Sequence, residues 1–200
     1  MRLLHALIAR PLTYRIWQAP FADRKIHPIL AHNDLTRVRR VLDVACGPGT
    51  NTKYFRGVEY LGVDWNEDYI HYASRRYGRD FVCADVTDPD FAVVGAFDFI
   101  LVNSVLHHLS DAEIGTLLER LAQLLSPDGS IHLLELVRPP TPGVAGLLAR
   151  LDRGRYARPL AEWHRLLTAA FVPERFEPYV LTGLGVPFWH MVYFKGRVAR

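Results

Sequence analysis

The stretch VLDVACGPGTNT, residues 41–52, decides the fold that this sequence predicts. It begins as an apolar run typical of a buried strand and continues into a loop that contains Gly47 and Gly49. Glycine lets a ligand approach the backbone closely, and N–H groups at the start of a following helix can bind it. A dinucleotide loop would need glycine at position 52, where this chain has Thr52. The pattern thus favours a ligand loop without a pyrophosphate, although a glycine pair also occurs in ordinary tight turns.

Strands and helices are predicted to alternate after this loop. Apolar runs typical of buried strands occupy residues 59–64, 80–85, 97–103 and 130–137. Two segments between these strands have the apolar spacing of a helix. The first ends at Gly78, and the second begins with a capping box formed by Ser110 and Glu113 and continues to Leu125. The alternation predicts right-handed crossovers and a parallel sheet with helices on both faces.

The pattern changes after PPTPG at residues 139–143. A helical, arginine-bearing insert follows, and two further strands are predicted near 176–181 and 189–196. Their short connection predicts an antiparallel hairpin at one edge of the sheet.

The composition narrows the class of protein. The 200 residues are half apolar and carry a net charge of +3, well below the basic stripe of a dedicated nucleic-acid binder. No stretch approaches the roughly 18 apolar residues of a membrane span. Cys46 and Cys83 are too few for a disulfide framework or a zinc site, so we expect two buried free thiols, no metal and a cytoplasmic protein.

Acidic residues end two of the predicted strands after the glycine loop. Asp64 closes the strand 59–64, where a carboxylate can accept from ribose hydroxyls, and Asp85 closes 80–85. Asp85 and the backbone N–H of Val86 suit the edge of an adenine. Each aspartate alone is more often a turn or helix cap, but open α/β sheets bind ligands at the carboxyl ends of their strands.

Taken in order, VLDVACGPGT, YLGVD, CADVTD, FDFILVNSVLHHL and LSPDGSIHLLEL resemble the class I S-adenosylmethionine-dependent methyltransferases over about residues 35–140. The resemblance implies a Rossmann-like α/β fold with a seven-stranded, mostly parallel sheet of order 3-2-1-4-5-7-6 and strand 7 antiparallel. It divides a single domain into an N-terminal helical cap (1–34), a cofactor-binding core (35–137), a substrate-side insert (138–172) and a C-terminal hairpin (173–200).

The resemblance also implies S-adenosylmethionine as cofactor and S-adenosylhomocysteine as product. The glycine loop would surround the methionine part, Asp64 the ribose, and Asp85 with Val86 the adenine, while Asn103 would offer its carbonyl to the amino group. The expected cofactor-binding residues are Asp43, Ala45, Cys46, Gly47, Gly49, Asp64, Trp65, Asp85, Val86, Asn103 and Ser104.

Two adjacent histidines follow the strand 97–103, and each is a candidate base. Methyl transfer from a sulfonium is an in-line displacement, which needs a base only when the acceptor must lose a proton. His107 or His108 could take that proton, or the pair could only shape the loop.

The acceptor is expected to be a small molecule held by the cap and the insert. Tyr14 and Trp17 are spaced to form an aromatic lid. The insert contains a cluster of Arg155, Tyr156 and Arg158, in which an arginine could grip an anionic group. The expected acceptor-binding residues are these five and His108. Packing and a solvated basic loop are the ordinary alternatives.

The sequence leaves three alternatives open. A nucleic-acid methyltransferase is disfavoured, because the chain has NSVL where amino-methylating enzymes of that kind carry D/N-P-P-Y/F/W, although a structured RNA substrate stays open. A cofactor-binding partner subunit without catalysis is a further alternative. The apolar N-terminus beside Arg2 and Arg10 would also suit peripheral contact with a membrane. The sequence does not indicate an oligomeric state.

Overall fold

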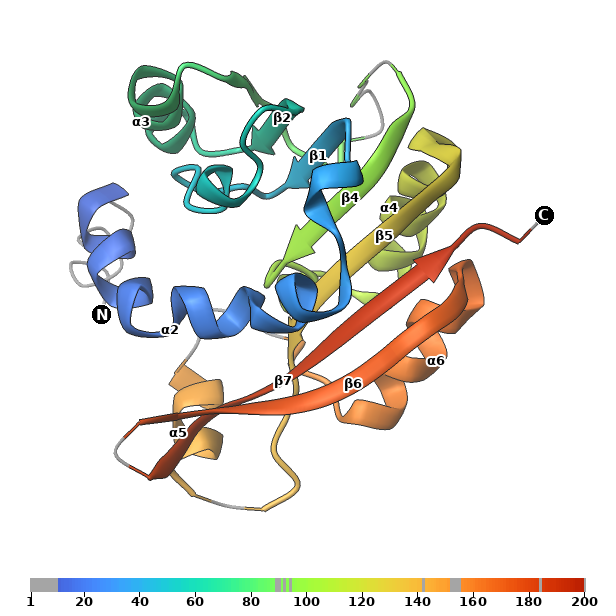
Figure 1. Ribbon diagram of the computed structural model, residues 1–200. Helices are drawn as coiled ribbons and strands as arrows, with labels where there is room; N and C mark the ends of the chain where they lie inside the picture. The colour runs from blue at the N-terminus through green and yellow to red at the C-terminus, as the bar shows by residue number, and fades with distance from the viewer. Residues whose placement is uncertain are drawn as a thin grey trace. The chain divides into compact units, whose positions relative to one another are not determined.

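The computed structural model describes residues 11–88, 91, 93, 95–141, 143–151, 156–183 and 185–199, without the side chains of 11–20, 150 and 151. Its seven strands form one sheet in the order β3-β2-β1-β4-β5-β7-β6, as predicted (Figure 1). The chain divides into two compact units, Met1–Ala92 and Val93–Arg200.

The first unit holds the glycine loop. Its strands β1 (Arg40–Val44), β2 (Glu59–Asp64) and β3 (Asp80–Cys83) are parallel, and α3 (Glu67–Tyr77) packs on β2 and β3. The long helix α2 (Pro11–His32) contacts α3, and two short 3-10 turns are η1 (Leu35–Arg37) and η2 (Thr52–Tyr54). The fully buried Val41, Leu42, Val44 and Val63 show that β1 and β2 lie in the core.

The second unit is built on β4 (Phe97–Asn103) and β5 (Leu125–Leu136), which are parallel, and on β6 (Val172–Gly183) and β7 (Val186–Arg197), which form an antiparallel hairpin. Strand β7 pairs antiparallel with β5, as predicted. The helical elements are η3 (Leu106–His108), α4 (Asp111–Leu124), α5 (Val144–Leu151) and α6 (Leu160–Ala170). Helix α4 contacts β5 and α6, and α5 contacts β7.

Both predicted helix boundaries are present. Gly78 ends α3 with φ 59°, a left-handed conformation that glycine adopts without steric cost, and its N–H donates to the carbonyl of Ser74. The Ser110 side chain accepts from the Glu113 N–H, and the Glu113 carboxylate accepts from the Ser110 N–H. These local patterns fix where α3 ends and where α4 begins.

Several boundaries differ from the prediction. Leu125 belongs to β5 and not to α4, and it pairs with Phe97 before a shift in register. Gly129 lies in this irregular stretch, where a Cβ would come 2.7 Å from the Phe97 carbonyl oxygen. The hairpin strands also extend beyond 176–181 and 189–196, by one to four residues at each end.

The prediction that Cys83 is buried is wrong. Its side chain is exposed, whereas Cys46 is buried as expected, and both thiols are free. Strand β3 lies at the edge of the sheet, and three of its four residues, Asp80, Val82 and Cys83, are exposed.

No helix within the described part of the chain combines the length and the apolar character that crossing a bilayer requires.

Candidate functional site

Two backbone N–H groups of the loop after β1 donate hydrogen bonds to residues at the end of β2. The N–H of Cys46 donates to the Val63 carbonyl at 3.0 Å, and the N–H of Gly47 donates to Asp64 Oδ2 at 2.8 Å. Ala45 has φ 55°, which is sparsely populated for a residue with a side chain and persists only where neighbouring contacts hold it. The loop is therefore rigid and strained, a combination that is frequent at ligand sites.

Gly49 is required by both conformation and space. Its φ is 74°, and a Cβ would lie 2.9 Å from Tyr77 Cε2 and 3.1 Å from Ala73 Cβ. The second glycine of the motif thus lets the loop pack against α3.

Asp43 lies beneath this loop and is fully buried. Its Oδ2 accepts from the Tyr60 hydroxyl at 2.6 Å and from Asn51 Nδ2 at 3.2 Å. Burial raises the pKa of Asp43 to about 7; the two hydrogen bonds oppose the rise, and the charge of Asp64 adds to it. Asp43 organises the loop through Asn51, and its direct contact with a cofactor stays a prediction.

Asp64 ends β2 with its carboxylate oriented by two backbone donors. Oδ2 accepts from Gly47 and Oδ1 accepts from the N–H of Asn66 at 2.9 Å. Burial raises the pKa of Asp64, although these two N–H groups favour its charged form. Each oxygen has a second lone pair, so the carboxylate can accept further donors such as hydroxyls.

Trp65 directly follows Asp64 and is 74% exposed. So large an exposed aromatic surface costs free energy in water, and it suits contact with a planar ligand.

Asp85 lies two residues beyond the end of β3, and not in the strand as predicted. Its Oδ1 accepts from the N–H of Thr87 at 2.8 Å and from the Thr87 hydroxyl at 2.7 Å, which forms a side-chain turn, and the next residue, Val86, is buried. Asp85 itself is exposed, so its carboxylate is accessible to a ligand.

In the second unit, the turn after β4 carries the remaining predicted residues. Asn103 ends β4, and Ser104 has φ 56°, the other left-handed non-glycine residue in the described chain. The N–H of Ser104 donates to the Leu134 carbonyl on β5 at 2.8 Å. This loop, like the one after β1, is strained and held from a neighbouring strand.

The two histidines of η3 differ in their environments. His107 is 3% exposed, and its Nδ1 lies 2.8 Å from Glu135 Oε2. His108 is exposed, and its ring centroid lies 4.2 Å from that of His107. The structure therefore makes His108 the accessible member of the pair.

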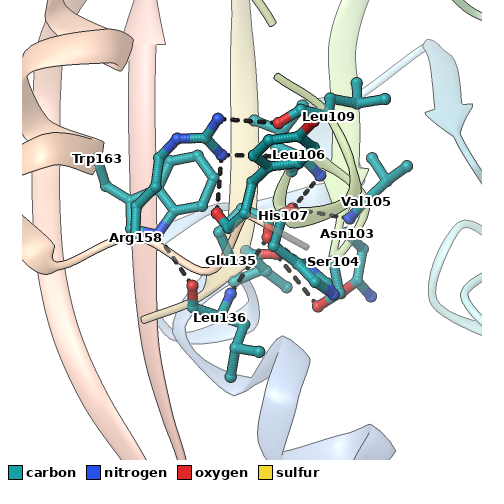
Figure 2. Close-up of polar contacts among 12 residues, drawn as sticks. Asn103, Ser104, Val105, Leu106, His107, Leu109, Glu135, Leu136, Arg158 and Trp163 are labelled. Carbon is teal, nitrogen blue, oxygen red and sulfur yellow. Dashed lines mark hydrogen bonds and ion pairs between the residues drawn. The ribbon is translucent and has the colours of Figure 1, made fainter. Parts of the chain in front are cut away.

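Glu135 is a residue that the sequence reasoning missed. It is fully buried near the end of β5, where its Oε1 accepts from the N–H groups of Val105 and Leu106 (Figure 2). Burial alone would raise its pKa, but the charge and hydrogen bond of His107 and the two N–H donors hold the pKa of Glu135 below its ordinary value. The signal was available, because Glu135 is the one acidic residue in the apolar run SIHLLELV.

Arg158, one of the two arginines predicted to grip an anionic acceptor, is bonded within the protein. The guanidinium is 4% exposed, and all five of its N–H groups have partners within the protein. Nε and Nη2 donate to Asp111 Oδ1 at 2.9 and 2.6 Å, and Nη1 and Nη2 donate to the carbonyls of Tyr156, Leu106 and Leu109. The side chain has no N–H group left for a ligand.

The other predicted acceptor residues are only partly described. Tyr156 is 41% exposed, and its N–H donates to the His107 carbonyl at 3.0 Å, so it lies beside η3. The side chains of Tyr14 and Trp17 lie outside the described residues, as does Arg155.

This chain is similar in sequence and in fold to known methyltransferases. A sequence family described as a methyltransferase domain matches residues 41–129, which include the glycine loop, Asp64, Asp85 and the histidine pair. This part of the chain is a methyltransferase domain, and the relatives and the fold support a class I S-adenosylmethionine-dependent methyltransferase. The fold agrees with that of the N-methyltransferase NodS from Bradyrhizobium japonicum, solved with S-adenosylhomocysteine: the TM-score is 0.69 at 17% identity, over 89% of this chain and 88% of that one.

Curated methyltransferases are also similar in sequence. The fatty-acid O-methyltransferase of Mycolicibacterium smegmatis is 33% identical over 66% of this chain and 43% of its own length. The trans-aconitate 2-methyltransferase of Methylobacterium radiotolerans is 30% identical over 75% of this chain and 65% of its own length. The chain thus spans less than two thirds of the length of these methyltransferase relatives.

Proposed function

We propose that this methyltransferase transfers the methyl group of S-adenosylmethionine to a small-molecule acceptor. The observation that carries the proposal is the arrangement at the end of β2, where Gly47 and Asn66 orient the Asp64 carboxylate and the exposed Trp65 is the next residue in the chain. A fixed acceptor of hydrogen bonds and an open aromatic surface at the end of one strand suit a ribose joined to a planar base.

The residues present fit this cofactor. Asp64 would accept from the ribose hydroxyls and Asp85 from the exocyclic amine of adenine, while the N–H of Val86 would donate to the ring. The glycine loop and the carbonyl of Asn103 would hold the methionine part, together with Ala45, Cys46 and Ser104. S-adenosylmethionine supplies an electrophilic methyl group, so the chain itself has to position the acceptor and exclude water.

The names of the relatives support small carboxylic acids as the first acceptors to test, since a fatty acid and trans-aconitate are both carboxylates at neutral pH. A carboxylate oxygen carries no proton at that pH, so its methylation needs no base. A phenol or an amine must lose a proton, and for such acceptors we propose His108 as the base, because it is exposed whereas His107 is bonded to Glu135.

Calorimetric titration with S-adenosylmethionine and S-adenosylhomocysteine tests the cofactor site. We expect the wild type to bind both and Asp64→Ala to lose about tenfold or more in affinity, because a charge-assisted hydrogen bond contributes about 1.5–3 kcal/mol. The matched control is Asp68→Ala, an exposed acid four residues later on α3.

The titration and assays of turnover with different acceptors decide different claims. No binding by folded wild-type protein contradicts the proposal. Binding without turnover, across carboxylic acids, phenols and amines, would support the alternative of a cofactor-binding partner subunit. Methylation of a structured RNA, with none of the small acceptors, would support an RNA substrate.

A further inference from the structure

The short helix η3, which carries both histidines, is held at its two ends by side chains of opposite charge (Figure 2). At its start, Glu135 Oε1 accepts from the N–H groups of Val105 and Leu106 at 2.7 and 2.8 Å. At its end, Arg158 donates to the carbonyls of Leu109 at 2.8 Å and Leu106 at 3.4 Å. A negative charge at the start of a helical turn and a positive charge at its end both favour the turn electrostatically.

This turn needs support from outside. One helical turn is not stable alone, because its few hydrogen bonds do not offset the entropy of ordering the backbone. Ser104, just before it, has a left-handed φ of 56°, a strained conformation for a residue other than glycine. Such a backbone persists only where surrounding contacts hold it: the Leu134 carbonyl accepts from the Ser104 N–H, and Glu135 and Arg158 hold the turn that follows.

Arg158 is itself held rigidly. Its guanidinium lies 5.1 Å from the ring centre of Trp163 and 5.5 Å from that of Tyr156. The indole N–H of Trp163 donates to the Leu136 carbonyl at 2.9 Å, next to Glu135 in β5. The two charged side chains that hold η3 are therefore connected to the same end of β5.

Glu135 also fixes the orientation of the histidine rings. An ionised carboxylate only accepts, so its 2.8 Å contact with His107 places a proton on Nδ1 of that ring. The ring of His107 then lies 4.2 Å, centre to centre, from the exposed ring of His108. A change at Glu135 is thus transmitted to His108 through one ring contact.

We propose that Glu135 and Arg158 are positioning residues, which fix η3 so that His108 keeps a single orientation during methyl transfer. This inference rests on the proposed function, since it assigns both residues to the same reaction. Neither is a catalytic residue, because both act through the backbone of η3 and the ring of His107.

Two variants test the inference, with a matched control. Arg158→Lys keeps the charge but loses the planar fork that serves Asp111 and the carbonyls together. Glu135→Gln keeps the shape but loses the charge. The control is Arg165→Lys, because Arg165 donates to the other oxygen of the same Asp111 carboxylate at 3.1 Å and its side chain is exposed.

With a phenol or amine acceptor found by screening, we expect Arg158→Lys and Glu135→Gln to lower kcat by about tenfold to a hundredfold, as a misplaced catalytic group does. The affinity for S-adenosylhomocysteine and the KM of the acceptor should change little, and Arg165→Lys should match the wild type. A kcat equal to that of the wild type in both test variants would overturn the inference.

Nuclear magnetic resonance of the histidine rings gives a measurement that needs no turnover. The wild type should show His107 protonated on Nδ1, and both test variants, but not Arg165→Lys, should shift and broaden the His108 signals. Unmoved His108 signals in the test variants would overturn the positioning role. If the protein neither bound S-adenosylhomocysteine nor methylated an acceptor, the proposed function would fail, and the ring signals alone would decide the positioning role.

Discussion

At the scale of the residue, two neighbouring histidines have different predicted roles because only one is accessible. His107 is buried against Glu135, whereas His108 is exposed. We expect His108→Gln to lower kcat by about 10²- to 10⁴-fold for an acceptor that loses a proton, and to leave the kcat for a carboxylate acceptor nearly unchanged. Rates measured between pH 6 and 9 with both acceptors check this, and equal losses for the two would exclude His108 as a base.

The sequence predicted the positions of some residues in this site and not of others. Gly49 and Asp64 could be placed because one belongs to a local motif and the other ends a strand. Glu135 was missed because its partners lie about 30 residues away in the chain. The partners of Arg158 were not predicted for the same reason: Asp111 is 47 positions away, and composition alone does not distinguish a buried arginine from one that faces a ligand.

At the scale of the element, two glycines with open space around them should respond oppositely to the same substitution. Gly115 lies inside α4, where alanine is favoured by about 1 kcal/mol, so Gly115→Ala should stabilise the protein. Gly78 ends α3 with φ 59°, so Gly78→Ala should destabilise it by about 1 kcal/mol. Urea unfolding of both variants checks the signs, and a shift in the same direction for the two would contradict this account.

The ends of helices were predictable where a local cap defines them. The start of a strand was not predictable where pairing with another strand defines it. The capping box at Ser110 and the glycine after Tyr77 appear as the sequence indicated. The start of β5 at Leu125 does not, because the pairing of Leu125 with Phe97 extends the strand through a proline and a glycine. Tertiary pairing there overrides the helical spacing of leucines that predicts a longer α4.

At the scale of the whole molecule, the alternation of strands and helices predicted a parallel sheet with right-handed crossovers, and the resemblance to the class I methyltransferases supplied the strand order. The dependence of stability on pH was not predictable, since it follows from which titratable groups are buried. His132 is buried in β5, where it stacks on Phe99 at 3.8 Å and contacts the Tyr193 hydroxyl at 2.9 Å. Burial, with a smaller effect of Lys195, lowers the pKa of His132 well below 6.5.

His132 and Asp43 should affect acid stability with opposite signs. Below pH 6.5 the unfolded state protonates His132 and the folded state does not, so this residue lowers the free energy of unfolding as pH falls, by up to about 1.4 kcal/mol per pH unit. The pKa of Asp43 is raised by burial from 3.8 to about 7, so between these values the folded state holds the extra proton and gains stability as pH falls.

We therefore expect His132→Gln to make the loss of stability between pH 6.5 and 4 shallower, and Asp43→Asn to make it steeper. Both variants remove a titrating group while keeping a side chain that can hydrogen-bond, so the slope is informative even where the absolute stability changes. Urea unfolding at intervals across this range measures the slopes. Parallel curves for the wild type and either variant would show that the substituted group has the same pKa in the folded and unfolded states.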